Sequence, residues 1–311
     1  MSVPAPKSVA PASAGSSVPL GLLLGFIGVC LFGVTVPATR YAVHWLDPAF
    51  LTFARATLAG VLGVAILVMR GARWPHTRGA RMRDIVVVAG CLVFGFPLLM
   101  AYGSLTVPSS HAGVVLAILP LMTTLGAMLV AGERPTLTFL AISALGCGLV
   151  MAFAFRNGAA GSLGAGDSLL ALAAIICAFG YAVSGRLSRH MPGWEVICWV
   201  VAVSLVVTVP GMFLTAPYGH FDAVPLSAWV ALIYVGAVSQ FFAFFFWNKG
   251  MALGGIARVG QVQLMQTFLI VVFSWPINGE APDLETYLFM GLVIAVVALG
   301  QKAKVKGTAP G

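Results

Sequence analysis

The feature that most constrains this chain is a series of long apolar stretches separated by short polar breaks. A helix needs about 20 mostly apolar residues to cross ~30 Å of hydrocarbon, and ten stretches come close to that length. They are residues 19–39, 49–69, 84–103, 111–131, 136–155, 167–187, 195–215, 226–248, 259–277 and 284–301. Only 8% of the 311 residues are charged and 60% are hydrophobic, which leaves too little charge to cover a soluble protein. The sequence therefore predicts an all-α polytopic membrane protein with ten transmembrane helices.

The polar segments divide the chain further. Residues 1–18 are rich in Pro, Ala and Ser and are predicted to form a disordered tail, and residues 302–311 form a basic C-terminal tail. Residues 19–155 and 167–301 hold five apolar stretches each, joined by the Gly-rich linker 156–166. No clear cleavage site closes the first apolar stretch, so we expect an uncleaved first helix.

Lysine and arginine are distributed unevenly between the two sides of the predicted bundle. With the N-terminus inside, fourteen of the 17 basic residues fall on the cytoplasmic side: Lys7, Arg70, Arg73, Arg78, Arg81, Arg83, Arg134, Arg186, Arg189, Lys249, Arg258, Lys302, Lys304 and Lys306. Cytoplasmic loops of membrane proteins carry this excess of positive charge. We therefore expect a bacterial inner-membrane protein whose two termini lie in the cytoplasm.

An internal repeat is the second strong constraint. A shift of 147 residues places GERP (132–135) on GEAP (279–282), and so Glu133 on Glu280. The same shift places Cys30, Phe32 and Gly33 on Cys177, Phe179 and Gly180. Each unit holds five helices, and an odd number makes the second unit enter the membrane from the opposite side. The fold expected is two inverted five-helix repeats around a central cavity, as in many secondary transporters. Duplication in a membrane enzyme or a structural protein is the alternative.

Three motifs carry a resemblance to a known family. They are CLFGVTVPATRYAV in the first helix, PAFLTFARATLAG in the second, and the GE pair that closes helices four and nine. The chain resembles the drug/metabolite transporter superfamily and, within it, the ten-helix EamA-domain exporters. Its size and aromatic-rich second half are similar to the YddG-type exporters of aromatic amino acids. The resemblance implies that helices 1, 3, 4, 6, 8 and 9 line a central cavity and that helices 5 and 10 lie further out.

One departure from the family pattern concerns the fourth helix of each repeat. Helix four holds a mid-helix proline, Pro120, whereas its repeat mate in helix nine is Thr267. We therefore expect that the two halves do not bend alike.

Motifs of catalysis and cofactor binding are missing from the sequence. It holds no GxSxG, no HExxH and no Walker loop, so no catalytic residues and no ATP-driven step are predicted. The five cysteines lie in apolar stretches without metal-ligand spacing, so we expect no metal, cofactor or disulfide framework. The basic residues lie beside the membrane spans, which argues against nucleic acid as a partner. The expected partners are the lipid bilayer and a small-molecule substrate, and the oligomeric state stays open, with a monomer plausible.

Acidic residues bear on the energy source of transport. All nine carboxylates fall at span ends or in loops, whereas ion-coupled pumps usually carry one in the membrane interior. This distribution favours facilitated export. A proton-coupled drug/metabolite exporter of the same superfamily is the alternative.

Polar and aromatic side chains inside the spans predict where a substrate binds. Gln240, Phe244, Trp247 and Asn248 share one face of helix eight, and Gln263, Gln266 and Thr267 share a face of helix nine. Tyr181, Tyr102 and Thr35 are expected to complete the cavity wall. Arg55 lies ~10 Å into helix two at 1.5 Å per residue, and two roles stay open for it: a structural clamp or a contact with a substrate carboxylate.

These observations favour a secondary transporter that exports small amphiphilic metabolites by alternating access. A cavity of aromatic rings and amides suits aromatic or other hydrophobic amino acids, and we expect no enzymatic activity. Two alternatives belong to other functional classes: a membrane-embedded enzyme with dispersed catalytic residues, and a non-transporting receptor or scaffold.

Overall fold

The computed structural model describes residues 14–72, 79–156, 164–219, 221–279, 281, 284–302 and 305–306. Seven helical stretches in this part of the chain are long and apolar enough to cross a membrane, and three shorter apolar helices accompany them at Leu116–Ala131, Leu137–Leu149 and Tyr287–Gly300. The ten match the ten predicted apolar stretches one for one. The prediction of an all-α polytopic membrane protein is confirmed.

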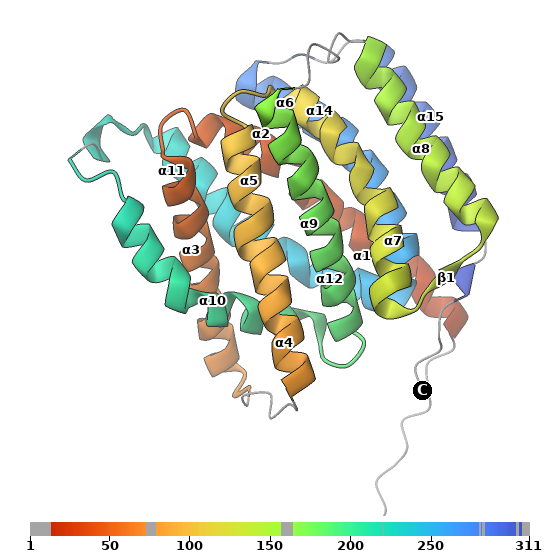
Figure 1. Ribbon diagram of the computed structural model, residues 1–311, viewed down its shortest axis with the longest axis horizontal. Helices are drawn as coiled ribbons and strands as arrows, with labels where there is room; N and C mark the ends of the chain where they lie inside the picture. Colours follow the sequence, from red (N-terminus) through yellow and green to blue (C-terminus); the bar gives the residue numbers. More distant parts are fainter. Residues whose placement is uncertain are drawn as a thin grey trace, which may run out of the picture.

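Several of the spans are built from more than one helical segment (Figure 1). The first half comprises α1 (Ala14–Gly33) with α2 (Thr35–Ala42), α3 (Pro48–Met69), α4 (Gly79–Val88) with η1 (Ala89–Gly95) and α5 (Phe96–Gly103), α6 (Ser109–Val115) with η2 (Leu116–Ile118) and α7 (Leu119–Ala131), and α8 (Leu137–Arg156). The second half comprises α9 (Ala165–Leu187), α10 (Gly193–Thr215), the short η3 (Phe221–Ala223), α11 (Leu226–Ile233) with η4 (Tyr234–Phe242) and α12 (Ala243–Gly254), α13 (Ile256–Gly260) with η5 (Gln261–Gln263) and α14 (Leu264–Asn278), and α15 (Leu284–Lys302).

The ends of the chain differ in part from the expectation. Helix α1 begins at Ala14, so the last five residues of the predicted tail 1–18 are helical, and the rest of that tail lies outside the described residues. In the predicted C-terminal tail, β2 (Val305–Lys306) pairs antiparallel with β1 (Arg134–Pro135). The end of the chain is thereby held beside the GERP motif.

Each half packs against the other through equivalent helix pairs. A contact made by one span of the first half recurs between the repeat mates of the two spans. Helix α1 packs on α12 and α5 packs on α9, while α3 packs on α10 and α8 packs on α15. In Figure 1, α8 and α15 lie at one edge of the bundle, away from α9 and α12. This is the place that the resemblance implied for helices 5 and 10. The pairing pattern is what a two-fold relation between five-helix units produces.

Glycines allow the closest of these approaches, between α1 and α12. A Cβ atom added at Gly21 would lie 2.8 Å from the Cα atom of Gly254, and one added at Gly250 would lie 3.2 Å from the Cα atom of Gly25. Small residues let helix backbones come together where lipid offers no hydrophobic driving force for association. The small-residue spacing in the first span therefore serves a contact within the chain.

Departures from α-helical geometry recur at related positions in the two halves. The π-helical segments η1 and η4 interrupt spans three and eight, and the 3-10 turns η2 and η5 interrupt spans four and nine. A 3-10 turn forms at η5 although span nine has no proline equivalent to Pro120, and the expectation that the halves do not bend alike stays a prediction. Local π-helical segments often lie at functional sites, and both lie at the centre of this bundle.

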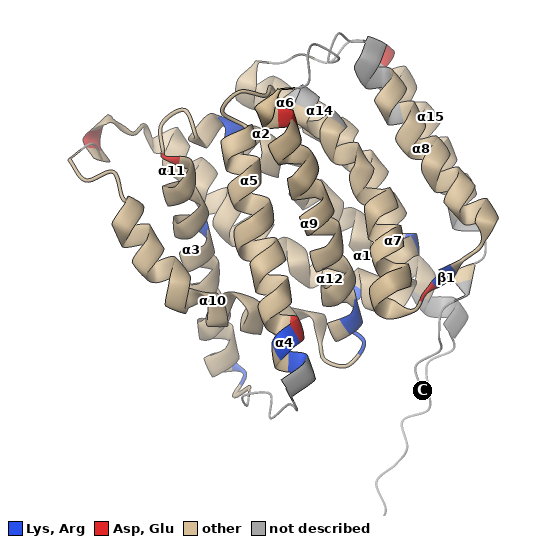
Figure 2. Ribbon diagram, viewed as in Figure 1, with Lys and Arg blue, Asp and Glu red and all other residues tan. Residues whose placement is uncertain are grey.

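Charged residues gather mainly at one end of the bundle (Figure 2). We call this the basic end, and it holds Arg70, Arg81, Arg83, Arg134, Arg186, Arg189, Lys249 and Arg258. The other end, called the opposite end, holds Arg40 with Asp47, Asp167 and Asp222. The side chain of Asp47 accepts hydrogen bonds from the backbone N–H groups of Ala49 and Phe50, at 2.8 and 3.0 Å, and so caps α3.

Candidate functional site

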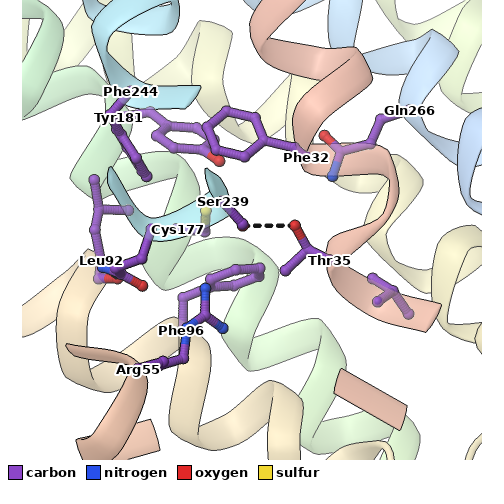
Figure 3. Close-up of a pocket in the computed structure, with 12 residues that line it drawn as sticks. Phe32, Thr35, Arg55, Leu92, Phe96, Cys177, Tyr181, Ser239, Phe244 and Gln266 are labelled. Carbon is purple, nitrogen blue, oxygen red and sulfur yellow. Dashed lines mark hydrogen bonds between the residues drawn. The ribbon is translucent and has the colours of Figure 1, made fainter. Parts of the chain in front are cut away.

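A small cavity lies at the centre of the bundle between the two halves (Figure 3). Its walls come from spans 1, 2 and 3 of the first half and spans 6, 8 and 9 of the second. They are formed by Phe32, Thr35, Val36, Arg55, Leu92, Phe96, Cys177, Tyr181, Ser239, Gln240, Phe244 and Gln266. The cavity volume is about 20 Å³, enough for about one water molecule. Ligand pockets usually measure about 300–1,000 Å³, so in this conformation the bundle is closed around a much smaller cavity.

Three aromatic rings, of Phe32, Tyr181 and Phe244, form one side of the cavity. Phe32 lies 5.1 Å from Phe244 and 6.2 Å from Tyr181, measured between ring centroids. Trp247 stands behind them, 5.2 Å from Tyr181 and 6.0 Å from Phe32. These separations are those of attractive ring pairs. The cluster offers an apolar surface contributed by both halves, in which most ring pairs are tilted or edge to face.

Hydrogen bonds between the halves surround the cavity. The hydroxyls of Thr35 and Ser239 are 2.6 Å apart, and Gln240 Nε2 donates to the carbonyl of Leu92 at 3.0 Å. Leu92 belongs to η1, and Ser239 and Gln240 belong to η4. The two π-helical segments are therefore joined directly at the site.

Two cavity residues keep polar atoms without a partner among the described residues. They are Nε of Arg55 and Oε1 of Gln266. Arg55 is 3% exposed and Gln266 is 7% exposed. A buried polar atom without a hydrogen bond is costly. Each atom therefore lacks the hydrogen bond that would offset its burial.

Six of the eleven predicted cavity residues line the cavity: Thr35, Arg55, Tyr181, Gln240, Phe244 and Gln266. Trp247 lies in the second layer, behind the aromatic rings. Asn248 accepts from the Ser184 hydroxyl at 2.9 Å and donates to the Gly193 carbonyl at 3.1 Å, so it joins helices instead of facing the cavity.

The other three predicted residues also lie elsewhere. Gln263 accepts from the Thr123 hydroxyl at 3.2 Å, and the Thr267 hydroxyl donates to the Gly113 carbonyl at 3.0 Å. Both bonds join spans four and nine, because these spans cross closely at that level. Tyr102 was expected in the wall, but it is 42% exposed, since the last turn of α5 directs it away from the bundle.

The structure adds six wall residues that the sequence did not single out: Phe32, Val36, Leu92, Phe96, Cys177 and Ser239. Two of them, Phe32 and Cys177, belong to residue pairs related by the 147-residue shift, but the shift does not indicate which member of each pair faces the cavity. Phe32 is 4% exposed, whereas its repeat mate Phe179 is 44% exposed. No periodic signal marks Leu92, because η1 breaks the α-helical period.

The basic end is closed by a charged network that we call the Glu133 latch. Glu133 accepts from the backbone N–H groups of Ile256 and Ala257, each at 2.8 Å, and forms an ion pair with Arg189. A carboxylate at this place caps the N-terminus of α13. The latch joins the end of span four to the start of span nine and the end of span six.

A second ion pair lies beside the latch. Arg186 Nη2 lies 2.8 Å from Asp84 Oδ2, and Arg186 Nη1 donates to the carbonyl of Val130 at 3.0 Å. Asp84 comes from the first half and Arg186 from the second. Both ion-pair contacts therefore connect the halves at this end.

The opposite end is closed by bonds of a different kind. Arg40 donates to the carbonyls of Ser104 and Val107, each at 2.7 Å, and Asn278 Nδ2 donates to the Ser109 hydroxyl at 2.9 Å. Among the described residues, no ion pair joins the halves at this end. Glu280, the repeat mate of Glu133, lies outside the described residues.

Neither a metal site nor a disulfide appears in the part of the chain that the structure describes. No group of three His, Cys, Asp or Glu side chains is placed to hold a metal ion there, and Cys30, Cys91, Cys147, Cys177 and Cys198 are free thiols. The seven carboxylates within the described residues lie at span ends or in loops, and none lines the cavity.

Comparison with known proteins agrees with this architecture. The EamA-like transporter family model matches twice, at residues 19–154 and 164–299, close to the two predicted repeats. A solved crystal structure superposes with a TM-score of 0.67 at 21% identity, covering 92% of this chain and 95% of the other. That likeness concerns the fold alone.

Curated relatives are named as transporters. The chain is 41% identical to the uncharacterized transporter YdeK of Bacillus subtilis (strain 168), over 84% of this chain and 89% of the relative. It is 28% identical to the probable terminal-alkyne amino-acid exporter of Streptantibioticus cattleyicolor, over 85% and 87%. It is 24% identical to the aromatic amino acid exporter YddG of Ancylobacter novellus, over 90% and 98%. With both halves matched by the family model, and in agreement with the resemblance to the drug/metabolite transporter superfamily, the chain belongs to the EamA-like transporter family.

Proposed function

We propose that this transporter exports aromatic or other hydrophobic amino acids by alternating access through the central cavity. The observation that carries the proposal is the cluster of Phe32, Tyr181 and Phe244 rings beside Gln240 and Gln266 in one enclosed site. An apolar surface with a few fixed polar groups suits a solute that has an apolar body and a polar head. Two relatives whose names specify amino acids as the exported solutes support the same substrate class.

Alternating access requires each end of the cavity to open in turn. The walls come from both halves, so a rocking of one half against the other enlarges the cavity from its closed volume. The Glu133 latch would part when the basic end opens, and the hydrogen bond from Asn278 to Ser109 would part when the opposite end opens. In this proposal the two ends are the gates of the carrier.

Orientation follows from the charge distribution. Most of the described arginines and lysines lie at the basic end, whereas Arg40 lies at the opposite end (Figure 2). This excess of positive charge supports an orientation with the basic end in the cytoplasm of a bacterial inner membrane. The Glu133 latch is then the cytoplasmic gate.

The energy source in this proposal is the substrate gradient. No described carboxylate lines the cavity, and a proton-coupled carrier usually holds one in the membrane interior. The protein therefore works as a facilitator and not as an enzyme.

Reconstitution into liposomes tests the function. We expect saturable flux of phenylalanine, tryptophan and leucine down their gradients, and no flux of a quaternary amine. If no amino acid moves, the proposed function is wrong. Accumulation driven by an imposed pH gradient would instead support the proton-coupled exporter.

Single substitutions in the cavity sharpen the test. Replacing Phe244→Ala, Gln240→Leu or Gln266→Leu should lower flux about tenfold, which corresponds to about 1.4 kcal/mol of lost interaction. The matched control is Gln263→Leu, the same change on the same span as Gln266 but outside the cavity wall. Flux that is equal in Gln263→Leu and in the three cavity variants would move the site elsewhere.

A further inference from the structure

Arg55 presents a positive charge to the centre of the bundle, and no described residue forms an ion pair with it. It lies seven residues into α3 from Pro48 and is 3% exposed. In Figure 3 its guanidinium group points up from α3 to a place beneath Phe96, on the side of the cavity away from Phe32 and Gln266. An arginine buried at membrane depth is costly without an anion or several acceptors around it.

The surroundings of Arg55 supply no such anion. Its Nε has no acceptor among the described residues, and the described ion pairs all lie at the basic end. The nearby hydroxyls of Thr35 and Ser239 are bonded to each other, and the Gln240 amide donates to Leu92. Tyr181 and Phe96 contribute rings to the wall. The guanidinium therefore borders an enclosed site in which the hydroxyls of Thr35 and Ser239 and the amide N–H of Gln240 are already paired.

We infer that Arg55 binds the carboxylate of the transported solute, and that this contact restricts the carrier to solutes with a carboxylate attached to an apolar body. The inference rests on the proposed function, since it names the substrate class of the same cavity. A guanidinium presents a planar set of N–H donors that matches the two oxygens of a carboxylate. The aromatic cluster then receives the apolar body on the other side of the cavity.

The cavity offers the ammonium group of an amino acid no charged partner among its described walls. Its described walls contain no carboxylate that could pair with a cation, and the unpartnered acceptor is the neutral Oε1 of Gln266. A neutral acceptor forms a weaker bond to ammonium than a carboxylate does. The carboxylate of the solute should therefore decide binding, and the amine should contribute less.

Four ligands that share a phenyl ring test this difference: L-phenylalanine, 3-phenylpropionate, L-phenylalaninamide and phenethylamine. Binding to the purified full chain in detergent is measured by calorimetric titration and by the shift in melting temperature. We expect the two carboxylates to bind about tenfold tighter, or more, than the amide and the amine, as a charged hydrogen-bonded pair gives. Equal binding of phenylalanine and its amide would overturn the inference.

Variants assign the selectivity to Arg55. Arg55→Met keeps the length of the side chain without its charge, and should reduce the ratio of phenylalanine to phenylalaninamide affinity to about one; Arg55→Lys keeps the charge without the planar fork and should retain an intermediate ratio. Arg40→Met, which removes a cation bonded to protein carbonyls, is the matched control and should leave the ratio unchanged. If Arg55→Met unfolds, the wild-type ligand series and Arg55→Lys still decide the question.

The outcomes separate this inference from the proposed function. If phenylalanine crosses liposomes but its amide competes equally well, the export function stands and the role of Arg55 is wrong. If the carboxylates bind selectively but none of them crosses the membrane, the site is correct and the transport proposal fails. Loss of stability in Arg55→Met, together with a wild type that does not distinguish the ligands, would make Arg55 a structural clamp.

Discussion

The two ends of the bundle close the same cavity with different chemistry. At the basic end, the buried carboxylate of Glu133 joins Arg189 to the first N–H groups of α13, and Arg186 pairs with Asp84. At the opposite end, Arg40 donates to two carbonyls and Asn278 to a hydroxyl. Opening the basic end separates charges that are paired across the halves, whereas opening the opposite end separates neutral partners such as Asn278 and Ser109.

This difference bears on how the carrier rests. Separating a buried ion pair leaves charges without partners, which costs more than exchanging a carbonyl for water. The basic end should therefore be the harder one to open in the absence of substrate. Three predictions test this ranking, each read out by melting temperature in detergent and by the reactivity of Cys177, a cavity thiol that is buried in the closed state.

The largest effect is expected for Glu133→Ala. The change removes the cap of α13 and leaves Arg189 unpaired, so the stability should fall by about 3 kcal/mol. In a background where Cys30, Cys91, Cys147 and Cys198 are alanine, Cys177 should react faster with a membrane-impermeant maleimide added at the basic end. Glu133→Gln keeps an acceptor for the cap and is expected to lose less stability. A melting temperature and a labelling rate equal to wild type would show that the latch does not hold this end.

Arg40→Met should have the next largest effect, with the opposite sidedness, because Arg40 holds the turn at Ser104 and Val107 that leads to Ser109, the partner of Asn278. Loss of two charged hydrogen bonds should lower the stability by about 2 kcal/mol. Cys177 should then react faster with reagent added at the opposite end, while its reactivity from the basic end stays as in wild type. Faster labelling from the basic end would contradict the assignment of Arg40 to this gate.

The smallest effect is expected for the Asp84–Arg186 pair, because both side chains are partly exposed to water. Asp84→Asn, Arg186→Gln and the double variant form a cycle whose coupling should be about 1 kcal/mol. Arg83→Gln is a matched control, since Arg83 lies 3.8 Å from the same aspartate with its side chain largely exposed. If this coupling free energy equals that of the Glu133–Arg189 pair, the Glu133 latch is not the stronger of the two ion-pair contacts at the basic end.

Much of this fold could be predicted from local features of the sequence. The apolar stretches gave the ten spans to within a few residues at most ends, and the cap of α3 follows from Asp47 before Pro48. The Gly-Glu pairs mark the ends of α7 and α14, where Gly132 and Gly279 both take the left-handed conformation, with φ of 65° and 76°. These features depend on residues close together in the chain, so the sequence displays them directly.

The candidate site was predictable only in part. Gln240, Phe244 and Gln266 stand out as polar or aromatic groups at helical spacing and do line the cavity. Asn248 and Thr267 have the same spacing but bond to neighbouring helices. An amide or hydroxyl in an apolar span needs a hydrogen-bond partner, and a backbone carbonyl of another helix serves as well as water in a cavity. Spacing alone does not distinguish these two surroundings.

By itself, the sequence determined the helical class, the number of spans and the five-helix repeat, because hydrophobic length and repeat offset are properties of the chain alone. The tertiary structure decided which copy of each repeated residue faces inward. Phe32 lies at the cavity and Phe179 on the surface, since the two halves pack against different partners. It also decided that Glu133 caps a helix 123 residues further along the chain, a contact that exists only because spans four and nine meet at the basic end.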